Sequence, residues 1–245
     1  MNPNIKFITI LLSALLLAAC ASAGTGGSGG VGGVVSSPGS GSGSGASSSG
    51  GTTAVISADD KPLDVMLKAM RAQLDAKSYR AHVTSSTDKG NTSTMVIEYA
   101  APDRYRMVNE GQTGGGKGYQ MEYVIADNKT FIKTPNGGWV KSPVDAGSII
   151  KAFRDPKMID ELTKTADVKF VGPDTLDGEP MLVYQYTQTN PMGMNLKSIS
   201  KTWLSVADGL PRKTETEGEF NGMKTKTLIT LSDFNTDIKI ESPVK

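Results

Sequence analysis

The sequence predicts an α+β domain built on one long antiparallel sheet, and three observations carry this prediction. One amphipathic segment with helical spacing precedes all of the strand-like segments. About ten or eleven segments then alternate apolar and polar residues between turn-forming dipeptides, which is typical of an antiparallel meander. Helical spacing returns in one region midway along the chain. Because helices and strands do not alternate regularly, the pattern indicates α+β and not α/β.

The first helix is expected to begin near Pro62 and to end near Lys77. Proline is tolerated at the first helical position because its missing N–H has no helical partner there, and Asp59 and Asp60 precede it. The apolar residues that recur at helical spacing are Leu63, Met66, Leu67, Met70 and Leu74. This stripe predicts a helix that packs with one face on the rest of the domain.

Alternation with a period of two begins directly after this helix. Met95, Ile97 and Tyr99, for example, fall on one face of their expected strand. Turn-forming pairs such as Asp127–Asn128 separate the segments. The strands expected in this half are Tyr79–Thr87, Thr92–Ala100, a short strand around Tyr105 and Met107, Tyr119–Ala126, Thr130–Lys133 and Trp139–Val140.

A helical pair is expected to interrupt the strands. Ile149, Ile150 and Phe153 have helical spacing, and Asp155–Pro156 suits the N-cap and first position of a second helix. The apolar residues of that second helix are Met158, Ile159 and Leu162. The strands expected after it are Val168–Val171, Met181–Gln188, Leu196–Val206, Arg212–Glu219, Met223–Leu231 and Asp237–Glu241.

The N-terminal residues have the features of a lipoprotein signal peptide. Lys6 precedes an apolar run, Phe7–Leu17, that is shorter than the roughly 20 residues of a spanning helix. The sequence Leu17-Ala18-Ala19-Cys20 at its end resembles the lipobox of bacterial lipoproteins. This resemblance implies removal of residues 1–19, diacylglycerol on the Cys20 sulfur and a fatty acid such as palmitate on the new amino group. An ordinary secretory signal with a chance cysteine and a retained membrane anchor are the alternatives.

Residues 20–58 are expected to be a tether. Gly, Ser, Ala and Thr dominate this segment, and it carries no charge. Such a chain cannot bury enough apolar surface to offset the entropy lost on ordering, so we expect disorder. Its r.m.s. span is roughly 30–35 Å. Residues 59–245 then suffice for a single domain with its own core.

The composition disfavours catalysis and nucleic-acid binding. Of the 26 Lys and Arg residues only Lys6 precedes Asp59, so the 25 acidic residues that follow are balanced, and no basic cluster suggests a nucleic-acid partner. His82 is the one histidine and Cys20 the one cysteine, which leaves no thiolate–imidazole metal site. No nucleophile elbow occurs in the domain. We therefore expect no enzyme, no metal and no cofactor.

Short motifs in the domain match a known pattern. A strand with an aromatic residue leads into a Gly-Leu-Pro-basic turn, a Pro-Asp-basic-aromatic step precedes an earlier strand, and a late strand ends on Asp-Phe. The matching sequences are Lys201-Thr202-Trp203-Leu204, Asp208-Gly209-Leu210-Pro211-Arg212-Lys213, Ala101-Pro102-Asp103-Arg104-Tyr105-Arg106 and Leu231-Ser232-Asp233-Phe234-Asn235. In these motifs residues 59–245 resemble the LolA/LolB lipoprotein-carrier superfamily and its relatives, the LppX/LprG-like lipoproteins.

The resemblance implies a strongly curved antiparallel sheet, a half-open β-barrel, whose concave face is covered by the N-terminal helix and the inserted helical pair. Acyl chains of a lipid or lipoprotein would enter between sheet and helices without any chemistry. The candidate lipid-binding residues are Met95, Ile97, Tyr99, Met121, Tyr123, Ile125, Trp139, Ile150, Phe153 and Tyr184.

The expected protein is thus an extracytoplasmic monomer that is held on membrane lipid through acylated Cys20 and carries a hydrophobic lipid or lipoprotein ligand. In a cell with two membranes it would lie on the periplasmic face of the outer membrane, and in a cell with one on the outer face of the plasma membrane. The alternative is a structural or protein-interaction lipoprotein, or an envelope sensor, that has the same sheet without a ligand cavity.

Overall fold

The computed structural model describes residues 55–143, 145–147, 150, 154, 166–189, 196–220 and 222–244. Helix α2 spans Pro62–Asp75. The strands are β1 (Ser78–Thr87), β2 (Thr92–Ala100), β3 (Arg104–Gln112), β4 (Gly118–Ala126), β5 (Lys129–Lys133), β6 (Trp139–Lys141), β7 (Asp167–Leu176), β8 (Glu179–Thr189), β9 (Leu196–Ser205), β10 (Pro211–Phe220) and β11 (Met223–Ser232).

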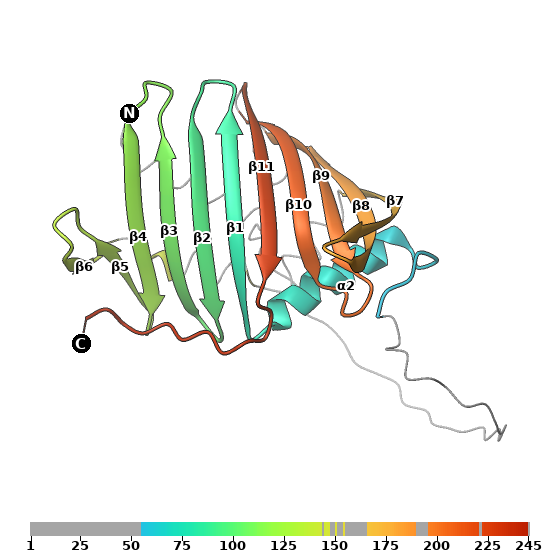
Figure 1. Cartoon of the computed structure of the whole chain (residues 1–245), viewed down its shortest axis with the longest axis horizontal. Coiled ribbons are helices and arrows are strands. Elements are labelled where there is room, and N and C mark those ends of the chain that lie inside the picture. Colours follow the sequence, from blue (N-terminus) through green and yellow to red (C-terminus); the bar gives the residue numbers. More distant parts are fainter. Residues whose placement is uncertain are drawn as a thin grey trace, which may run out of the picture.

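All of these strands belong to one sheet of eleven strands. Its order is β6-β5-β4-β3-β2-β1-β11-β10-β9-β8-β7, and every neighbouring pair is antiparallel (Figure 1). Two meanders therefore meet in the centre, where β1 pairs with β11. The antiparallel sheet predicted from the alternating segments is confirmed, and β3 is longer than the short strand that the sequence suggested.

The turns use the residues that tight hairpins require. Asp127 and Asn128, between β4 and β5, have φ angles of 54° and 56°, and Asp177 and Gly178, between β7 and β8, have 53° and 84°. Two successive residues in the left-handed region match the type I′ turn, whose twist suits antiparallel strands. The turn dipeptides recognised in the sequence therefore set the register of these hairpins.

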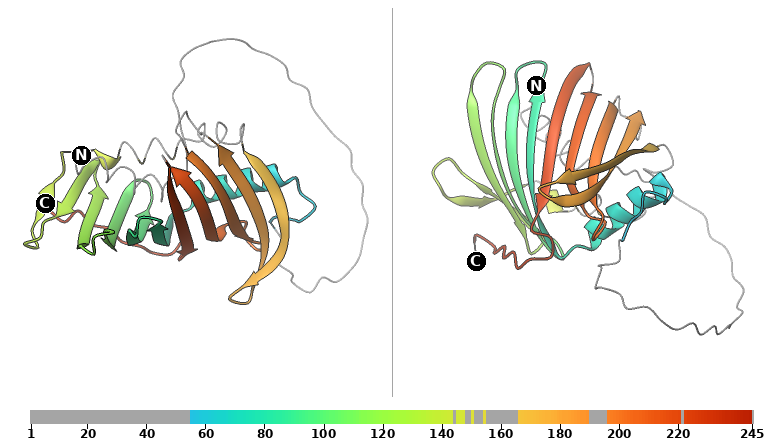
Figure 2. Two further views of the ribbon diagram at one scale, coloured as in Figure 1. Left: turned by 90° about the horizontal axis from the view of Figure 1, so that it is seen from above. Right: turned by 45° about the vertical axis from the view of Figure 1, so that its right-hand side comes forward.

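The sheet is curved and does not close. Strands β6 and β7 form its two edges, and β7, β8 and β9 curl around α2 (Figure 2). We call the face that contacts α2 the inner face and the opposite one the outer face. The curved, open sheet expected from the sequence is thus present, with α2 on its concave side.

Helix α2 forms where the apolar periodicity predicted it. Lys61 is extended and Pro62 occupies the first turn, as expected for proline. The side chains that α2 buries are Val65, Met66 and Ala69. Met66 belongs to the predicted stripe, while Val65 and Ala69 extend the buried surface to one side of it. The buried face is therefore shifted from the predicted stripe, whose other members are only half-buried.

Two apolar clusters cover the inner face. The larger one comprises residues of β1 to β4 and β11, including Ile97, Met107 and Ile229. The other lies between α2 and strands β8 and β9, and Tyr184 at its centre is fully buried. Ile56 belongs to this second cluster, so the packed part of the domain includes residues that the sequence analysis assigned to the tether.

The region of the predicted helical pair is described at few residues. Residues 146, 147 and 150 have helical backbone, and Ile150 is buried in the larger inner-face cluster. The other residues on which the prediction rests, Ile149, Phe153, Asp155–Pro156, Met158, Ile159 and Leu162, lie outside the described residues. The second helix therefore stays a prediction.

The strand expected at Asp237–Glu241 is wrong. This segment has no strand pairing and instead crosses the outer face, where Ile238 and Ile240 pack beside Val124 and Trp139 (Figure 1). Arg104 fixes it by donating a hydrogen bond of 2.9 Å to the carbonyl of Ile240. The alternation of apolar residues was real, but it reflects packing on the sheet surface and not a twelfth strand.

A row of ion pairs crosses the outer face of β1 to β5. It alternates in charge and consists of Asp233, Arg80, Glu98, Arg106, Glu122 and Lys133. Glu122 accepts hydrogen bonds of 2.8 Å from both Arg106 and Lys133. Burial alone would raise the pKa of Glu122, but these two cations outweigh it and hold the pKa below its usual 4.5. The row thus links five neighbouring strands.

Replacing Glu122 with Gln should lower the free energy of unfolding by about 1–2 kcal/mol at pH 7, because Arg106 and Lys133 lose a shared carboxylate that is 14% exposed. The folded-state pKa lies below the unfolded one, so this stabilisation is present at neutral pH and is lost as the pH falls through the folded value. Urea unfolding at pH 7 and about pH 3 measures both effects.

The matched control is Glu217→Gln, because Glu217 also pairs with a lysine, Lys226, but is 72% exposed. Solvent screens that pair, so the change should be smaller than for Glu122. Equal losses in the two variants at pH 7 would show that the ion-pair row has no special role.

Replacing Tyr184 with Phe should stabilise the protein by about 1 kcal/mol, because the buried Tyr184 hydroxyl has no hydrogen-bond partner in the described structure. The comparison is Tyr99→Phe, which removes a hydroxyl that donates to the carbonyl of Pro102 at 3.4 Å and should not stabilise. Chemical denaturation measures both. A loss of stability in Tyr184→Phe would mean that this hydroxyl has a partner.

Candidate functional site

A cavity of about 80 Å³ lies between α2 and the inner face, at the boundary between the two apolar clusters. Its lining comes from α2 and from β1, β2, β3, β8, β9, β10 and β11, together with Ile150 and Arg154. Strands from both meanders contribute because β1 and β11 are neighbours in the sheet. The sheet order therefore brings together residues more than a hundred positions apart.

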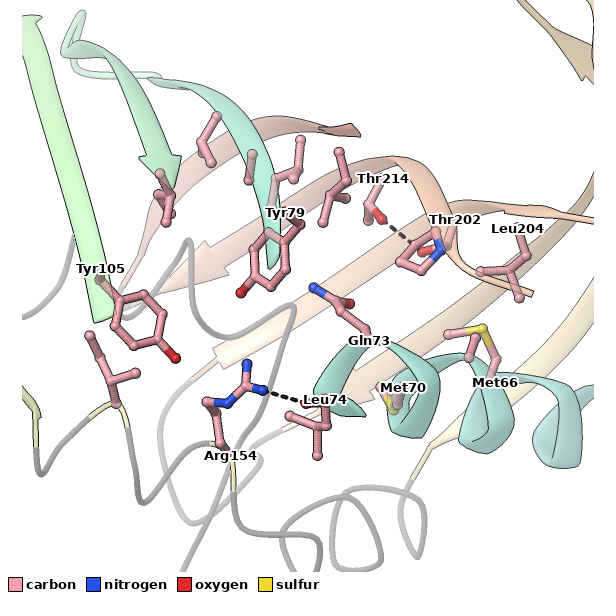
Figure 3. A pocket seen from close by; sticks show the side chains of 18 of the residues that line it. Met66, Met70, Gln73, Leu74, Tyr79, Tyr105, Arg154, Thr202, Leu204 and Thr214 are labelled. Carbon is pink, nitrogen blue, oxygen red and sulfur yellow. Dashed lines mark hydrogen bonds between the residues drawn. The ribbon is translucent and has the colours of Figure 1, made fainter. Parts of the chain in front are cut away.

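One end of the cavity is apolar. Met66 and Met70 of α2 lie there opposite Leu204 of β9 (Figure 3). Methionine side chains are unbranched and flexible, so they adapt to partners of different shape. None of these three side chains can hydrogen-bond strongly, and a hydrocarbon chain is the chemistry that they fit.

The other end is polar. The hydroxyls of Tyr79 and Tyr105 and the guanidinium of Arg154 point toward one another, with Gln73 beside them (Figure 3). The Arg154 guanidinium also donates a hydrogen bond to the carbonyl of Leu74 and lies 4.2 Å from the centre of the Tyr99 ring. A cation here is stabilised by the aromatic ring and by the last turn of α2.

The tyrosines at this end form a stack on the inner face. Ring centres are 5.1 Å apart for Tyr79 and Tyr99 and 4.9 Å apart for Tyr99 and Tyr105. Burial raises the pKa of Tyr79 and of Tyr105, and the nearby charge of Arg154 offsets this only in part. Both hydroxyls are therefore protonated at neutral pH and can donate hydrogen bonds.

Further along the strands the inner face becomes polar. Hydroxyl pairs join neighbouring strands there: Thr202 with Thr214 at 3.1 Å at the cavity wall, and beyond it Ser200 with Thr216 at 2.9 Å and Ser85 with Thr227 at 3.0 Å. These pairs satisfy one another, as buried hydroxyls require. Along β1, β9, β10 and β11 the apolar part of the inner face thus ends at these hydroxyl pairs.

The cavity volume restricts what the described arrangement can hold. A volume of 80 Å³ accommodates a few water molecules, at about 10–15 Å³ each on this scale. Pockets that enclose organic ligands are larger, roughly 300–1,000 Å³. A long acyl chain would therefore fit only if α2 moved away from the sheet.

A larger hollow of about 730 Å³ lies on the outer face of β1, β2 and β9 to β11. Its lining is mostly Ser, Thr, Lys and Glu, and two of its charged groups, Glu217 and Lys226, pair at 2.8 Å. Such a surface is already well solvated and self-paired, so it offers little for an apolar ligand.

The predicted lipid-binding residues that the structure describes are distributed over four places. Ile97 and Ile150 line the cavity. Met95, Tyr99, Met121, Tyr123 and Ile125 belong to the larger inner-face cluster next to it. Tyr184 lies under α2 in the second cluster, whereas Trp139 lies on the outer face, where the C-terminal segment packs. Phe153 and Cys20 are outside the described residues.

The polar end of the cavity was not predicted from the sequence. Tyr79 and Tyr105 were assigned to strands, but no role followed from that. Arg154 lies four residues after Ile150 in a segment with helical spacing, so a charge on the apolar face of a predicted helix was the available signal. Convergence of the three groups depends on the sheet order, which the alternation does not reveal.

The described residues offer neither a metal cluster nor a membrane-spanning helix. No group of three metal-ligating side chains occurs among them, and His82 is exposed on the outer face. No helix in the described part of the chain is both long and apolar enough to cross a membrane.

Comparisons with known proteins identify the fold. No family model matches the sequence, and no curated protein matches it either. The solved structure of LprF from Mycobacterium bovis is similar with a TM-score of 0.54 at 12% identity, over 74% of this chain and 96% of that one. Lipoprotein LppX from Mycobacterium tuberculosis is similar with a TM-score of 0.53 at 10% identity, over 73% and 97%. The chain therefore has the fold of these proteins, as its short motifs indicated.

Proposed function

We propose that this protein is a membrane-anchored lipoprotein that binds the acyl chain of a lipid or lipoprotein between α2 and the inner face of the sheet. The observation that carries the proposal is the apolar cavity bounded by Met66, Met70 and Leu204. The likeness to the fold of lipoprotein LppX supports it. Binding without chemistry agrees with the described lining, which consists of apolar and hydroxyl-bearing side chains, the amide of Gln73 and the cation of Arg154.

Binding would proceed by displacement of α2. Apolar contacts of Val65, Met66 and Ala69 hold this helix on the sheet, and such contacts are not directional. An acyl chain that enters below the helix replaces them with contacts of the same kind, so the buried apolar area changes little. The flexible methionines of α2 adjust to the chain.

The anchor would be Cys20. Diacylglycerol on its sulfur and a further acyl chain on its amino group give stable membrane attachment, since one chain alone gives only marginal binding. Residues 20–58 would let the domain work roughly 30–35 Å from the bilayer. The protein would lie outside the cytoplasm, on the outer membrane or on the outer face of the plasma membrane according to the cell.

The small cavity favours a second candidate function. A lipoprotein that binds a protein partner, or has a structural role, needs no space between α2 and the sheet, and 80 Å³ is little space. This second function predicts that the purified protein neither retains nor takes up acyl chains. Uptake of lipid therefore separates the two candidates.

The chain from residue 21 should retain lipid when it is expressed in bacteria, and native mass spectrometry should detect the bound species. Every described helix, strand and core cluster lies after residue 54, so this chain keeps all described contacts. Ala81→Leu should weaken acyl-chain binding about tenfold or more, because Ala81 lines the cavity and the added carbons fill it.

The control is His82→Leu, the same new side chain one residue along β1 on the outer face, which should bind as the wild type does. Thermal unfolding confirms that both variants are folded. Apo protein that takes up no chain, or equal binding by both variants, would contradict a cavity between α2 and the sheet.

Replacing Cys20 with Ser should abolish incorporation of labelled palmitate into the full-length chain and release the protein from the membrane fraction, because no other residue carries a thiol. Ser22→Ala, two positions further on, should change neither. Continued labelling of Cys20→Ser would disprove lipidation at this position.

A further inference from the structure

We propose that Arg154, Tyr79 and Tyr105 form an anion-binding subsite at the polar end of the cavity, so that the ligand is an amphiphile with a carboxylate or phosphate headgroup. The acyl chain would extend from this subsite toward Met66 and Met70. The inference rests on the proposed function, and it names the class of ligand that the cavity selects.

Among the described residues Arg154 has no anionic partner. Its guanidinium carries five N–H donors, and its described neighbours are the carbonyl of Leu74 and the hydroxyls of Tyr79 and Tyr105, all of them neutral. Among the described residues Arg154 forms no ion pair, although other arginines such as Arg80 and Arg106 each pair with two carboxylates. Its charge faces a cavity whose described lining contains no acidic residue.

The Tyr105 hydroxyl is a second, independent sign of a missing partner. It is buried, the residue as a whole is 5% exposed, and no described group accepts a hydrogen bond from it, because the neighbouring Arg154 side chain can only donate. A buried hydroxyl normally has a partner, and an orphaned one calls for an explanation. Together with Tyr79, it points toward the same space as the Arg154 guanidinium (Figure 3). One bound group could satisfy all three.

The chemistry of these groups selects a negative charge. Both tyrosines are neutral donors, and Arg154 is a permanent cation whose planar fork matches carboxylate and phosphate oxygens. A cationic headgroup would meet only donors and positive charge. A neutral ester would accept hydrogen bonds but would leave the charge of Arg154 without a counter-ion, so it should bind more weakly.

The apolar end fixes the orientation of the amphiphile. Met66, Met70 and Leu204 lie at the far side of the cavity from Arg154, and they provide contacts for hydrocarbon (Figure 3). The headgroup therefore lies near the last turn of α2, and the chain runs along the helix toward its first turns. Fatty acids and lipids with a phosphate headgroup share this layout.

The test compares dodecanoate with methyl dodecanoate by calorimetric titration of the chain from residue 21 at pH 8. The wild type should bind dodecanoate about tenfold or more tighter, the usual effect of a charge-assisted hydrogen bond. Arg154→Gln should bind both ligands equally, at the affinity of the wild type for the ester. Arg154→Lys should restore part of the preference, because it restores the charge.

Two further variants separate the subsite from general effects. Lys239→Gln removes a positive charge from the exposed C-terminal segment and should keep the preference. Tyr105→Phe removes the unpaired hydroxyl and should reduce the preference without loss of stability. Phosphatidic acid should compete with dodecanoate, whereas inorganic phosphate should not. Competition by inorganic phosphate would indicate a simple ion site and overturn the amphiphile assignment.

The outcomes also separate this inference from the proposed function. Equal binding of acid and ester by the wild type, or an unchanged preference in Arg154→Gln, would overturn the subsite while acyl-chain binding stands. Arg154 would then serve only to hold the last turn of α2. If the wild type bound neither ligand, the proposed function would fail, and the inference would fail with it.

Discussion

The structure depends on one constraint: an antiparallel sheet with an apolar inner face must be covered. Alternation along each strand places residues such as Ile97, Met107 and Ile229 on that face, where water contact would be costly. Helix α2 has 14 residues and buries its side chains mainly against β8 and β9. Among the described elements, α2 covers the inner face only as far as the boundary between the two apolar clusters. The cavity lies at this boundary.

The inner face changes in polarity along the strands, and this change limits where a ligand can bind. Tyr79 and Ala81 near the start of β1 face the cavity, whereas Ser85, further along the same strand, forms a hydroxyl pair with Thr227. Paired hydroxyls gain little from hydrocarbon and already satisfy one another. An acyl chain is therefore confined to the end of the sheet near α2, where apolar surface and flexible side chains coincide.

The sequence was informative wherever local chemistry decides the structure. Positive φ angles at Asp127 and Asn128 follow from the turn that these residues prefer, so the hairpins could be predicted. Alternation specifies a face but not a neighbour, which is why Asp237–Glu241 resembled a strand although it packs on the sheet surface. Trp139 was predicted to bind the ligand for the same reason. Which face of the sheet it lies on depends on the strand register, and alternation does not give the register.

The polar end of the cavity could not be predicted from the sequence, for a different reason. Arg154, Tyr105 and Tyr79 come from three separate segments, and the sheet order alone brings two of them together. Apolar residues such as Ile97 could be guessed because any inner-face position favours them. A polar group in an apolar cavity has no such periodic signature, and it becomes recognisable only through burial and a missing partner.

The outer face explains which part of the molecule can move. Ion pairs cross each boundary from β1 to β5, and Glu98 and Glu122 each bridge two cations, so separating these strands would break ion pairs of half-buried carboxylates. The side chains that α2 buries make apolar contacts with the sheet, and Lys68 and Arg154 each add a hydrogen bond to a backbone carbonyl. We therefore expect the helix, and not the sheet, to move when the cavity opens. An anion at Arg154 would bind beside this helix, so the headgroup and the moving element would share one residue.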